Sequence, residues 1–300
     1  MVTFTTPLPE SYYKLSRWLS DIRRSRLVTF VVLTGLQISP YLAHRHNSAV
    51  SRTPKVCYTC HIESNDCGLK QMLSFSVIIP TLNEEQTIGH SIHAVRSHQT
   101  PVQLIIVDGG STDQTRQIAQ AAGAKVFLAP RGRGSQCNAG AQQATGSILV
   151  FLHADTLLPA GAFSLLREFF SSAEIQAGAF RIQFTPGNWF LNGCARFSRF
   201  DSILTTFGDQ GLVVRRSFFA ALGGFPEWPL FEDVHFLQKA RQQTRIVKFP
   251  RPVVSSDRRF QEGGTVRQLL RNGWLLLRYL NGVSPWQLAD QYERTRPEIS

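Results

Sequence analysis

Acidic and polar side chains directly follow three apolar segments in the middle of the chain. The segments 75–80, 103–108 and 147–152 are short, rich in Val and Ile, and without helical spacing. Such segments are typical of strands buried on both faces of a parallel sheet. Ligands of open α/β sheets bind just beyond the carboxyl ends of such strands, so the polar residues there are expected to share one crevice. They are Asn83, Glu84, Asp108 and Asp155. Several carboxylates at one crevice suit a metal ion and a polar ligand that carries phosphate.

Helical patterns alternate with these strands. The expected helices are 84–97, 112–122, 135–144 and one that starts at Pro159. Ser111 is expected to cap the second helix, with Gln114 completing a capping box. Further strands are expected at 125–128, 178–184, 211–215 and 245–249. This alternation implies right-handed crossovers and a parallel sheet in the first half.

Composition narrows the class of protein. The 300 residues, with 43% hydrophobic and 18% charged residues, are enough for one large globular domain or two small ones. The net charge of +11 favours acidic lipid headgroups or phosphorylated substrates. No RNA- or DNA-binding motif accompanies the charge, so nucleic acid is not expected as a substrate. Five cysteines without framework spacing indicate a reducing compartment.

Residues 1–71 differ from the rest of the chain. They lack a sustained period, which predicts a poorly structured extension or an upstream start codon chosen in error, because Met72 lies three residues before the first strand. The apolar run Leu27–Ile38 would span about 18 Å as a helix, short of the roughly 30 Å hydrocarbon core. It resembles a signal-peptide core. Cys57–His61 matches a haem-attachment pattern that Cys67 could extend to a zinc site, and we interpret this as chance.

The polar clusters resemble those of the family-2 glycosyltransferases over roughly residues 75–260. The matching strings are Pro80-Thr-Leu-Asn-Glu-Glu85, Val107-Asp-Gly-Gly-Ser-Thr-Asp113, Asn138-Ala-Gly140, His153-Ala-Asp-Thr156, Gly208-Asp-Gln-Gly211 and Glu232-Asp233. The resemblance implies an α/β fold of the GT-A type, with a mostly parallel central sheet flanked by helices. It also implies a glycosyltransferase domain over 72–262, with a nucleotide-binding half (75–176) and an acceptor half (177–262). The segment 263–300 is expected to be amphipathic and helical.

The resemblance implies an enzyme that moves a sugar from a nucleotide-diphosphate sugar, such as a UDP- or GDP-sugar, to an acceptor hydroxyl or carboxyl. Relatives in the same bacterial subgroup are associated with glycosylation of carotenoid acids or other lipids at the membrane. A small-molecule or lipid acceptor is therefore expected. The expected location is the cytoplasm, with peripheral contact at the cytoplasmic face of the plasma membrane.

The same resemblance implies roles for individual residues. Asp233 corresponds to the family's catalytic base, beside Glu232. Asp155 would hold Mn²⁺ or Mg²⁺ on the diphosphate, with His153 as its neighbour in the metal motif. The expected nucleotide-binding residues are Pro80, Thr81, Asn83, Glu84, Asp108, Gly110, Arg131, Asn138 and Ala154. The expected phosphate and acceptor contacts are Asp209, Gln210, Arg258 and Arg259.

Two departures from the family pattern leave the nucleotide open. His153 replaces the first carboxylate of the metal motif, and Leu82 replaces an aromatic residue next to Thr81. Imidazole suits Mn²⁺ better than Mg²⁺; alternatively, His153 donates a hydrogen bond to the diphosphate. One carboxylate remains adequate because Mg²⁺ usually takes one or two, plus phosphates.

The chemistry that these residues could perform is transfer with inversion. The departing oxygen gains negative charge while the sugar becomes oxocarbenium-like, and a divalent cation neutralises that charge. A single carboxylate, Asp233, would take the proton of the acceptor. Back-side attack with one base predicts inversion of the anomeric centre.

Each residue also has a structural interpretation. Asp108 could form the turn before Gly109, and Asp155 could be a helix N-terminal charge. Glu232 and Asp233 could cap their helix. Arg131 and Arg133 could be solvated loop charges, with phosphate contact the alternative. Aromatic side chains of the second half, Trp189, Trp228 and Phe231, could be core rather than acceptor contacts.

The segment Val266–Leu280 is predicted to be an apolar helix with a narrow ridge formed by Arg267, Arg271 and Arg278. It could lie on a membrane surface and present a lipid acceptor. Alternatively, it is buried against the sheet with its arginines reaching solvent.

Three other functions can be compared with the sequence. A Rossmann oxidoreductase needs Gly-x-Gly-x-x-Gly after the first strand, where this chain has Pro80-Thr-Leu-Asn83. A nucleotidyltransferase would carry a glycine- and arginine-rich loop at the same place. A sugar-nucleotide-binding protein with a decayed site is suggested by His153 and Leu82.

Overall fold

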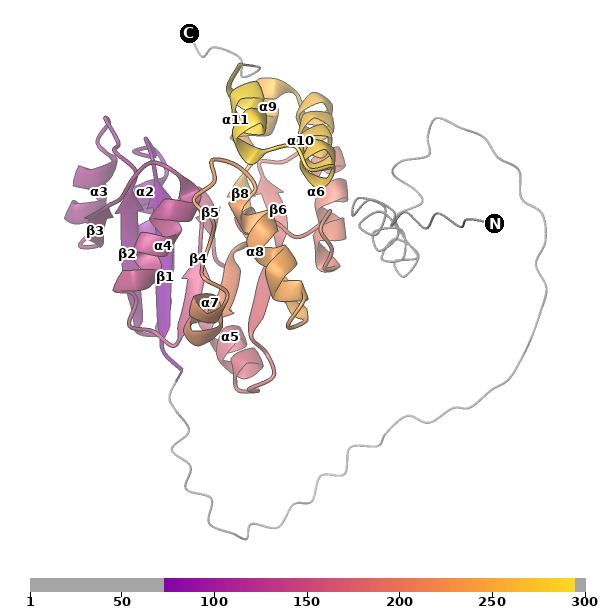
Figure 1. Ribbon diagram of the computed structural model, residues 1–300. Coiled ribbons are helices and arrows are strands. Elements are labelled where there is room, and N and C mark those ends of the chain that lie inside the picture. The colour runs from indigo at the N-terminus through magenta and orange to yellow at the C-terminus, as the bar shows by residue number, and fades with distance from the viewer. Residues whose placement is uncertain (1–72, 295–300) are drawn as a thin grey trace, which may run out of the picture. The chain divides into compact units, whose positions relative to one another are not determined.

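The computed structural model describes residues 73–294, apart from the side chains of Arg259, Glu262 and Arg294. The predictions for residues 1–71 lie outside the described residues. Within this part of the chain an eight-stranded sheet has the order β3-β2-β1-β4-β7-β6-β8-β5 (Figure 1). Its strands are β1 Phe75–Thr81, β2 Val102–Asp108, β3 Lys125–Leu128, β4 Ile148–Phe151, β5 Thr156–Leu157, β6 Ala177–Thr185, β7 Leu212–Arg215 and β8 Ile246–Ser256.

Helices flank this sheet. They are α2 Ile88–Arg96, α3 Thr115–Ala121, α4 Arg133–Gln143, α5 Ala162–Phe170, α6 Trp189–Ala195, α7 Arg216–Ala221, α8 Glu232–Arg241, α9 Arg258–Gly263, α10 Thr265–Leu280 and α11 Pro285–Arg294. Two 3₁₀ turns, η2 Arg196–Arg199 and η3 Gly208–Gln210, lie between α6 and β7. Among the described residues, no helix is both long and apolar enough to span a bilayer.

The first half of the sheet is parallel, as predicted. β1 pairs in parallel with β2 and β4, and β2 pairs in parallel with β3. The register places Thr81 opposite Asp108, so the polar segments that follow β1 and β2 leave the sheet at the same edge. β7 then runs antiparallel to β4 and to β6, while β6 and β8 are parallel. The mixed α/β class with a mostly parallel sheet is confirmed.

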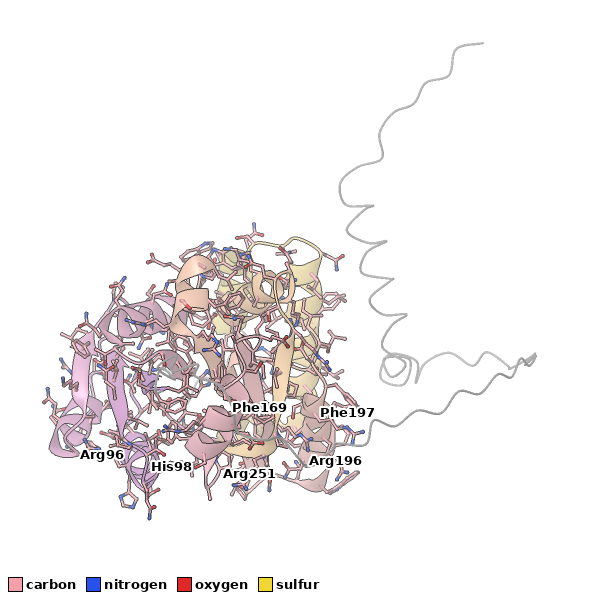
Figure 2. The ribbon with its side chains drawn as sticks, turned by 90° about the horizontal axis from the view of Figure 1, so that it is seen from below. Arg96, His98, Phe169, Arg196, Phe197 and Arg251 are labelled. Carbon is pink, nitrogen blue, oxygen red and sulfur yellow. The ribbon has the colours of Figure 1, made fainter. Side chains whose placement is uncertain are left out.

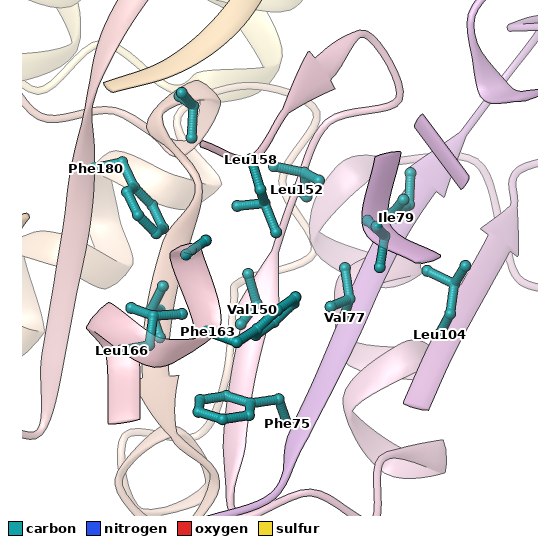
Figure 3. Packing of buried hydrophobic residues seen from close by; sticks show 14 of the residues in the cluster. Phe75, Val77, Ile79, Leu104, Val150, Leu152, Leu158, Phe163, Leu166 and Phe180 are labelled. Carbon is teal, nitrogen blue, oxygen red and sulfur yellow. The ribbon is translucent and has the colours of Figure 1, made fainter. Parts of the chain in front are cut away.

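Apolar residues of β1 pack on both faces of the sheet, which explains their lack of alternation. Val77 and Ile79 belong to the core cluster under α2 and α5, whereas Ile78 belongs to the cluster under α4 and α8. Figure 3 shows the first cluster, in which Phe75 lies 5.3 Å from Phe163 between ring centroids. Burial on both faces makes the sheet a rigid support for the loops at its edge.

Several predicted boundaries shift, among them the start of the helix expected from Pro159, which begins at Ala162. The helix expected at 112–122 begins at Thr115, and its N-cap Gln114 makes no side-chain capping bond. The predicted cap Ser111 is therefore wrong: its hydroxyl donates to the buried carboxylate of Asp108 instead. The first helix begins at Ile88 rather than 84, because Glu84–Thr87 form a turn in which Thr87 N donates to Glu84 O.

β8 continues to Ser256, well beyond the predicted end at 249, because it pairs with both β6 and β5. Its extension carries the chain to α9 at the carboxyl-end edge of β1 and β2. The opposite edge, at the amino ends of the parallel strands, presents Arg96, His98 and Arg251 in the view from below (Figure 2).

Candidate active site

A small, solvent-open pocket lies where β1 and β4 end and where α4 and α8 begin. Its lining residues are Pro80, Arg133, Cys137, Phe151, Leu152, His153, Gly208, Leu212, Phe225, Glu232 and Asp233. Predicted residues from three separate segments, Pro80, His153 and the pair Glu232–Asp233, are therefore gathered at one cavity. This is the edge at which open α/β sheets bind ligands.

Asp233 is held in a fixed orientation at this pocket. Its Oδ2 accepts a hydrogen bond from Gly208 N at 2.6 Å, and its Oδ1 accepts one from Val234 N at 2.8 Å. A Cβ on Gly208 would lie 3.0 Å from Asp233 Oδ2, so the close approach favours glycine there. Each carboxylate oxygen keeps lone-pair capacity beyond these contacts, and the side chain can accept a proton from a hydroxyl in the pocket.

The loop before Asp233 carries backbone strain. Phe231, the residue before α8, adopts the left-handed conformation with φ of 64°. Its ring stacks on Tyr279 of α10, with centroids 4.9 Å apart and planes at 28°. Non-glycine residues in this conformation cluster at functional sites, where their surroundings hold them in place. The stack therefore links α10 to the segment that carries Glu232 and Asp233.

Glu232 and Arg133 form an ion pair inside the pocket. Arg133 Nε lies 2.9 Å from Glu232 Oε1, and the Glu232 side chain is 5% exposed. Burial raises the pKa of Glu232, and the Glu232 charge raises the pKa of Arg133. Glu232 Oε2 accepts no hydrogen bond within the described residues. Because Arg133 Nη1 also lies 3.5 Å from His153 Nε2, the guanidinium spans the pocket.

Asp209 and Lys248 are ionisable groups next to this centre. Burial, followed by the nearby Asp233 charge, raises the pKa of Asp209 to about 6, and burial lowers the pKa of Lys248 to about 7. Asp209 Oδ1 is buried without a hydrogen-bond donor among the described residues. Lys248 Nζ donates to Gln210 Oε1, while Gln210 Nε2 donates to Thr205 O at 2.7 Å. Both the oxygen and the nitrogen of the Gln210 amide are therefore hydrogen-bonded to other residues of the chain.

Asp155 is the carboxylate expected from the sequence to hold a cation, and it is not among the residues that line the pocket. It is half-buried, and its Oδ1 accepts a hydrogen bond from Thr156 Oγ1 at 3.3 Å. It precedes the short strand β5, so the interpretation as a helix N-terminal charge is wrong. Within residues 73–294, no three His, Cys, Asp or Glu side chains group closely enough to hold a metal ion by themselves. The donor set fits Mg²⁺ or Mn²⁺ only where a bound ligand adds phosphate oxygens.

Asp108 is wholly enclosed. Its side chain is 0% exposed, and its Oδ1 accepts hydrogen bonds from Gly110 N at 3.1 Å and Ser111 N at 2.9 Å. Arg116 Nε lies 3.8 Å from the same oxygen. These are the contacts of a turn-forming residue, the alternative considered for this position. Thr81 is buried beside it, and its Oγ1 lies 3.5 Å from Asp108 Oδ2.

Asn83 and Glu84 tie the loop after β1 to other parts of the edge. Asn83, with φ of 54°, accepts a hydrogen bond from Thr112 N at 2.9 Å through Oδ1. Glu84 Oε2 lies 3.6 Å from Arg258 Nη2, across the edge on α9. The structure therefore brings together two of the predicted donor-binding residues, Glu84 and Arg258, that are far apart in sequence.

Other predicted residues lie away from the pocket lining. Arg131 is exposed, and Gly110 is exposed with φ of 94°. Ala154 is buried and its carbonyl accepts a hydrogen bond from Ser91 Oγ. Asn138 clamps the loop before α8, because its Nδ2 donates to Phe225 O at 2.8 Å and its Oδ1 accepts from Phe225 N at 3.0 Å. The side chain of Arg259 is outside the described residues.

Two residues at the site carry more than the sequence interpretation assigned to them. The sequence leaves Arg133 as either a solvated loop charge or a phosphate contact. In the structure it begins α4 and lies one turn before the buried Cys137, so both face the pocket. The expected helix, 135–144, begins two residues after Arg133, so the sequence pattern does not mark this spacing of four. Tyr279 belongs to the segment expected either on a membrane surface or buried against the sheet; burial, followed by the Asp233 charge, raises its pKa to about 12. No local pattern marks a contact between residues 48 positions apart.

Comparison with known proteins agrees with this architecture. Residues 76–223 match the model of glycosyl transferase family 2. Crystal structures of Staphylococcus aureus TarS have the same fold. The complex of TarS 1–349 with UDP-GlcNAc gives a TM-score of 0.53 at 21% identity, over 61% of this chain and 58% of that fragment. The complex with UDP gives 0.53 at 18% identity, over 73% and 70%. The segment 76–223 thus belongs to glycosyl transferase family 2, and its fold is of the GT-A type.

A curated relative is the 4,4'-diaponeurosporenoate glycosyltransferase of Staphylococcus aureus strain bovine RF122 / ET3-1. It is 27% identical over 146 residues, which cover 46% of this chain and 34% of the relative. The match therefore spans about a third of the length of the curated relatives.

Proposed function

We propose that this chain is an inverting glycosyltransferase that moves a sugar from a nucleotide-diphosphate sugar to an acceptor hydroxyl or carboxyl. The observation that carries the proposal is the orientation of Asp233. Its two oxygens are held by Gly208 N and Val234 N at 2.6 and 2.8 Å, at a pocket that also contains Arg133 and His153. A fixed carboxylate beside cationic and polar groups suits proton removal from an acceptor next to a bound anion.

The donor diphosphate is assigned to the side of the pocket opposite Asp233. Residues at the amino ends of α4 and α8 line the pocket, and helix N-termini favour anions. Arg133 would exchange Glu232 for phosphate oxygens, and Arg258 would move from Glu84 onto the same ligand. The Arg133 guanidinium 3.5 Å from His153 Nε2 disfavours a second cation at that nitrogen. We therefore assign His153 to hydrogen bonding of the diphosphate.

A divalent cation fits Asp155 together with donor phosphates, and Mg²⁺ or Mn²⁺ bound there would neutralise charge on the leaving diphosphate. The remaining groups of the chain then have separate tasks. Asp233 accepts the acceptor proton at a carboxylate oxygen, and Arg133 stabilises the anion that leaves. Since one base acts from the side opposite the leaving group, the product inverts the anomeric centre.

The nucleotide is assigned to the loops after β1 and β2. Asn83 and Gly110 are exposed there, while Glu84 is half-buried. Because the Asp108 carboxylate is enclosed, we assign to Asp108 the role of holding the turn Gly109–Ser111, whose backbone would face the base or ribose. UDP- and GDP-sugars are the candidate donors.

The acceptor is proposed to be a lipid or carotenoid-type molecule, and the enzyme to act as a peripheral protein at the cytoplasmic face of the membrane. The support is the relative named for a carotenoid acid, 4,4'-diaponeurosporenoate, together with the basic charge of +11. A carboxylate acceptor needs less help from a base than a hydroxyl, because it is already ionised at neutral pH.

Donor hydrolysis measured across UDP-, GDP- and TDP-sugars with Mn²⁺ or Mg²⁺ tests the proposal. We expect turnover of one nucleotide class, its loss in Asp233→Asn, and stabilisation of the fold by the matching nucleoside diphosphate plus metal. Binding of a nucleotide without turnover of any donor would instead favour a sugar-nucleotide-binding protein. Transfer to an acceptor with retained configuration, seen by NMR, would contradict inversion.

A further inference from the structure

Helix α10 has three distinct sides. Its inner side, with Gln268, Leu275 and Leu276, is buried against the fold. A second side exposes Val266, Leu270, Trp274 and Leu277, whose exposed fractions are 57%, 70%, 56% and 42%. At 100° per residue these four fall within about 80° of one another. The exposed residues therefore form a continuous stripe along the helix, separate from the side that is buried against the fold.

Arginines border the stripe. Arg267, Arg271 and Arg278 lie about 100–140° around the helix from Val266, directly beyond Trp274. Arg271 and Arg278 also reach α11, where they donate to Tyr292 O and Gln291 Oε1, whereas Arg267 is exposed. An apolar stripe with cationic residues on its edge is the pattern of a helix that lies in the plane of a membrane interface.

Helix α6 adds aromatic surface at the start of α10. Asn188, its N-cap, donates through Nδ2 to Thr265 Oγ1 at 2.9 Å, so the two helices begin beside each other (Figure 1). Trp189 follows Asn188 and is 86% exposed, with its ring 5.9 Å from that of Phe190. Exposed tryptophans are costly in water but are favoured at the headgroup level of bilayers.

We propose that the α6–α10 surface, formed by Trp189, Val266, Leu270, Trp274, Leu277 and Arg267, docks on an anionic lipid bilayer. The proposal deepens the proposed function, on which it rests for the lipid acceptor. Charge complementarity selects this occupant: cationic residues border the stripe, and the chain as a whole carries +11, whereas a second copy of the chain would bring like charge to the face.

Binding of α10 to the bilayer would place the membrane contact close to the segment that carries Glu232 and Asp233. Tyr279, near the end of α10, stacks on Phe231, and its hydroxyl donates to Gln238 Oε1 of α8 at 3.2 Å. The helix that meets the bilayer thus contacts the residue directly before Glu232 and Asp233.

Flotation of the full chain with vesicles tests the surface. We expect binding to phosphatidylglycerol-containing vesicles, weaker binding to pure phosphatidylcholine, and a partition coefficient lower by at least about tenfold in Leu270→Ser/Trp274→Ser. Val266→Ser/Leu277→Ser is an independent pair on the same stripe and should behave alike. Arg267→Gln should lose roughly fivefold on anionic vesicles only.

Matched controls lie at the other end of the sheet. Leu128→Ser removes an apolar side chain that is 68% exposed on β3, and Lys125→Gln removes an exposed charge there; both should float like the wild type. If both stripe pairs also float like the wild type, the proposal is overturned. It is equally overturned if light scattering shows a dimer that Leu270→Ser/Trp274→Ser converts to monomer.

Donor hydrolysis in vesicle-free buffer separates this proposal from the proposed function. The stripe variants should hydrolyse donor at the wild-type rate, because no stripe residue lines the pocket. Flotation that depends on the stripe, in a chain that hydrolyses no donor, would support the docking surface and contradict the enzyme. Normal donor hydrolysis without stripe-dependent flotation would support the enzyme and contradict the docking surface.

Discussion

Arg133 Nε lies 2.9 Å from Glu232 Oε1, and this contact joins the first residue of α4 to the first residue of α8. A cation at a helix N-terminus is unfavourable, whereas a carboxylate there is favourable. Arg133 therefore needs a nearby anion to compensate its charge at the start of α4. In the absence of donor, Glu232 is that anion. A diphosphate that enters the pocket offers the same compensation with more acceptor oxygens.

Removal of Arg133 should affect stability and activity separately. Arg133→Met leaves the buried Glu232 carboxylate unpaired, which should cost about 3–5 kcal/mol of unfolding free energy. The double variant Arg133→Met/Glu232→Gln should recover most of that stability, because neither member of the pair then carries a charge. It should not recover donor affinity. Denaturant unfolding and the donor KM measure the two effects.

The exposed neighbour Arg131→Met is the matched control and should change neither quantity. Recovery of donor affinity in the double variant would contradict a phosphate contact by Arg133 and would reduce its role to pairing with Glu232.

Asp233→Asn tests the assignment of the base. Asparagine keeps an oxygen that can accept the Gly208 N–H but cannot take up a proton from the acceptor. We expect kcat for transfer to fall by about 10²–10⁴-fold with the donor KM nearly unchanged. Steady-state kinetics with saturating acceptor measure both. A parallel loss of thermal stability would indicate that the carboxylate acts mainly by holding the η3 turn.

The parallel half of the sheet could be predicted from the sequence because its strands are buried on both faces. Short continuous apolar runs such as Val77–Ile79, rich in β-branched residues and bounded by polar clusters, favour strands over helices. The sequence also predicts that Asp155 follows a strand and that Asp233 lies at the start of a helix, because strand ends and helix starts are set by local sequence. β8 was expected to end at 249, because its pairing with β5 is a contact between residues about 100 positions apart.

The side-chain partners at the site could not be predicted in the same way. Asp108 ends β2 as expected, but its enclosure depends on Ser111 and Arg116, which turn back on it only in three dimensions. Arg133 and Arg131 stand two residues apart in one loop-like string, and only the start of α4 at Arg133 decides which of them faces the pocket. Tyr279 meets Phe231 through packing of α10, for which the sequence holds no local signal.

Asp155→Asn should raise the concentration of metal needed for activity. Asp155 is the half-buried carboxylate assigned to the cation, and loss of its charge leaves mainly donor phosphates as ligands. The effect on the metal concentration at half-maximal rate should exceed the roughly 10–100-fold that loss of a ligand's supporting partner costs. Titration of Mn²⁺ and Mg²⁺ at fixed donor measures it. The same titration on His153→Gln should show a smaller shift in metal dependence and a larger one in donor KM; a reversed order would make His153 a ligand.

Asp209 should make stability fall as pH rises. Its pKa is raised from 3.8 to about 6 by burial and by the Asp233 charge. Between pH 4 and 6 the folded state therefore binds more protons at this group than the unfolded state, so the free energy of unfolding decreases as pH increases through this range. The loss should be complete above about pH 7 and amount to at most about 3 kcal/mol.

Asp209→Asn removes this dependence, because an amide stays neutral at every pH. The variant should gain stability over the wild type from pH 4 to pH 8, as measured by urea unfolding in buffer with EDTA. Asp290→Asn, which alters an exposed carboxylate on α11, provides the baseline. A difference between wild type and Asp209→Asn that stays constant with pH would show that Asp209 is ionised in the folded state throughout, with Lys248 as the neighbouring cation that holds it so.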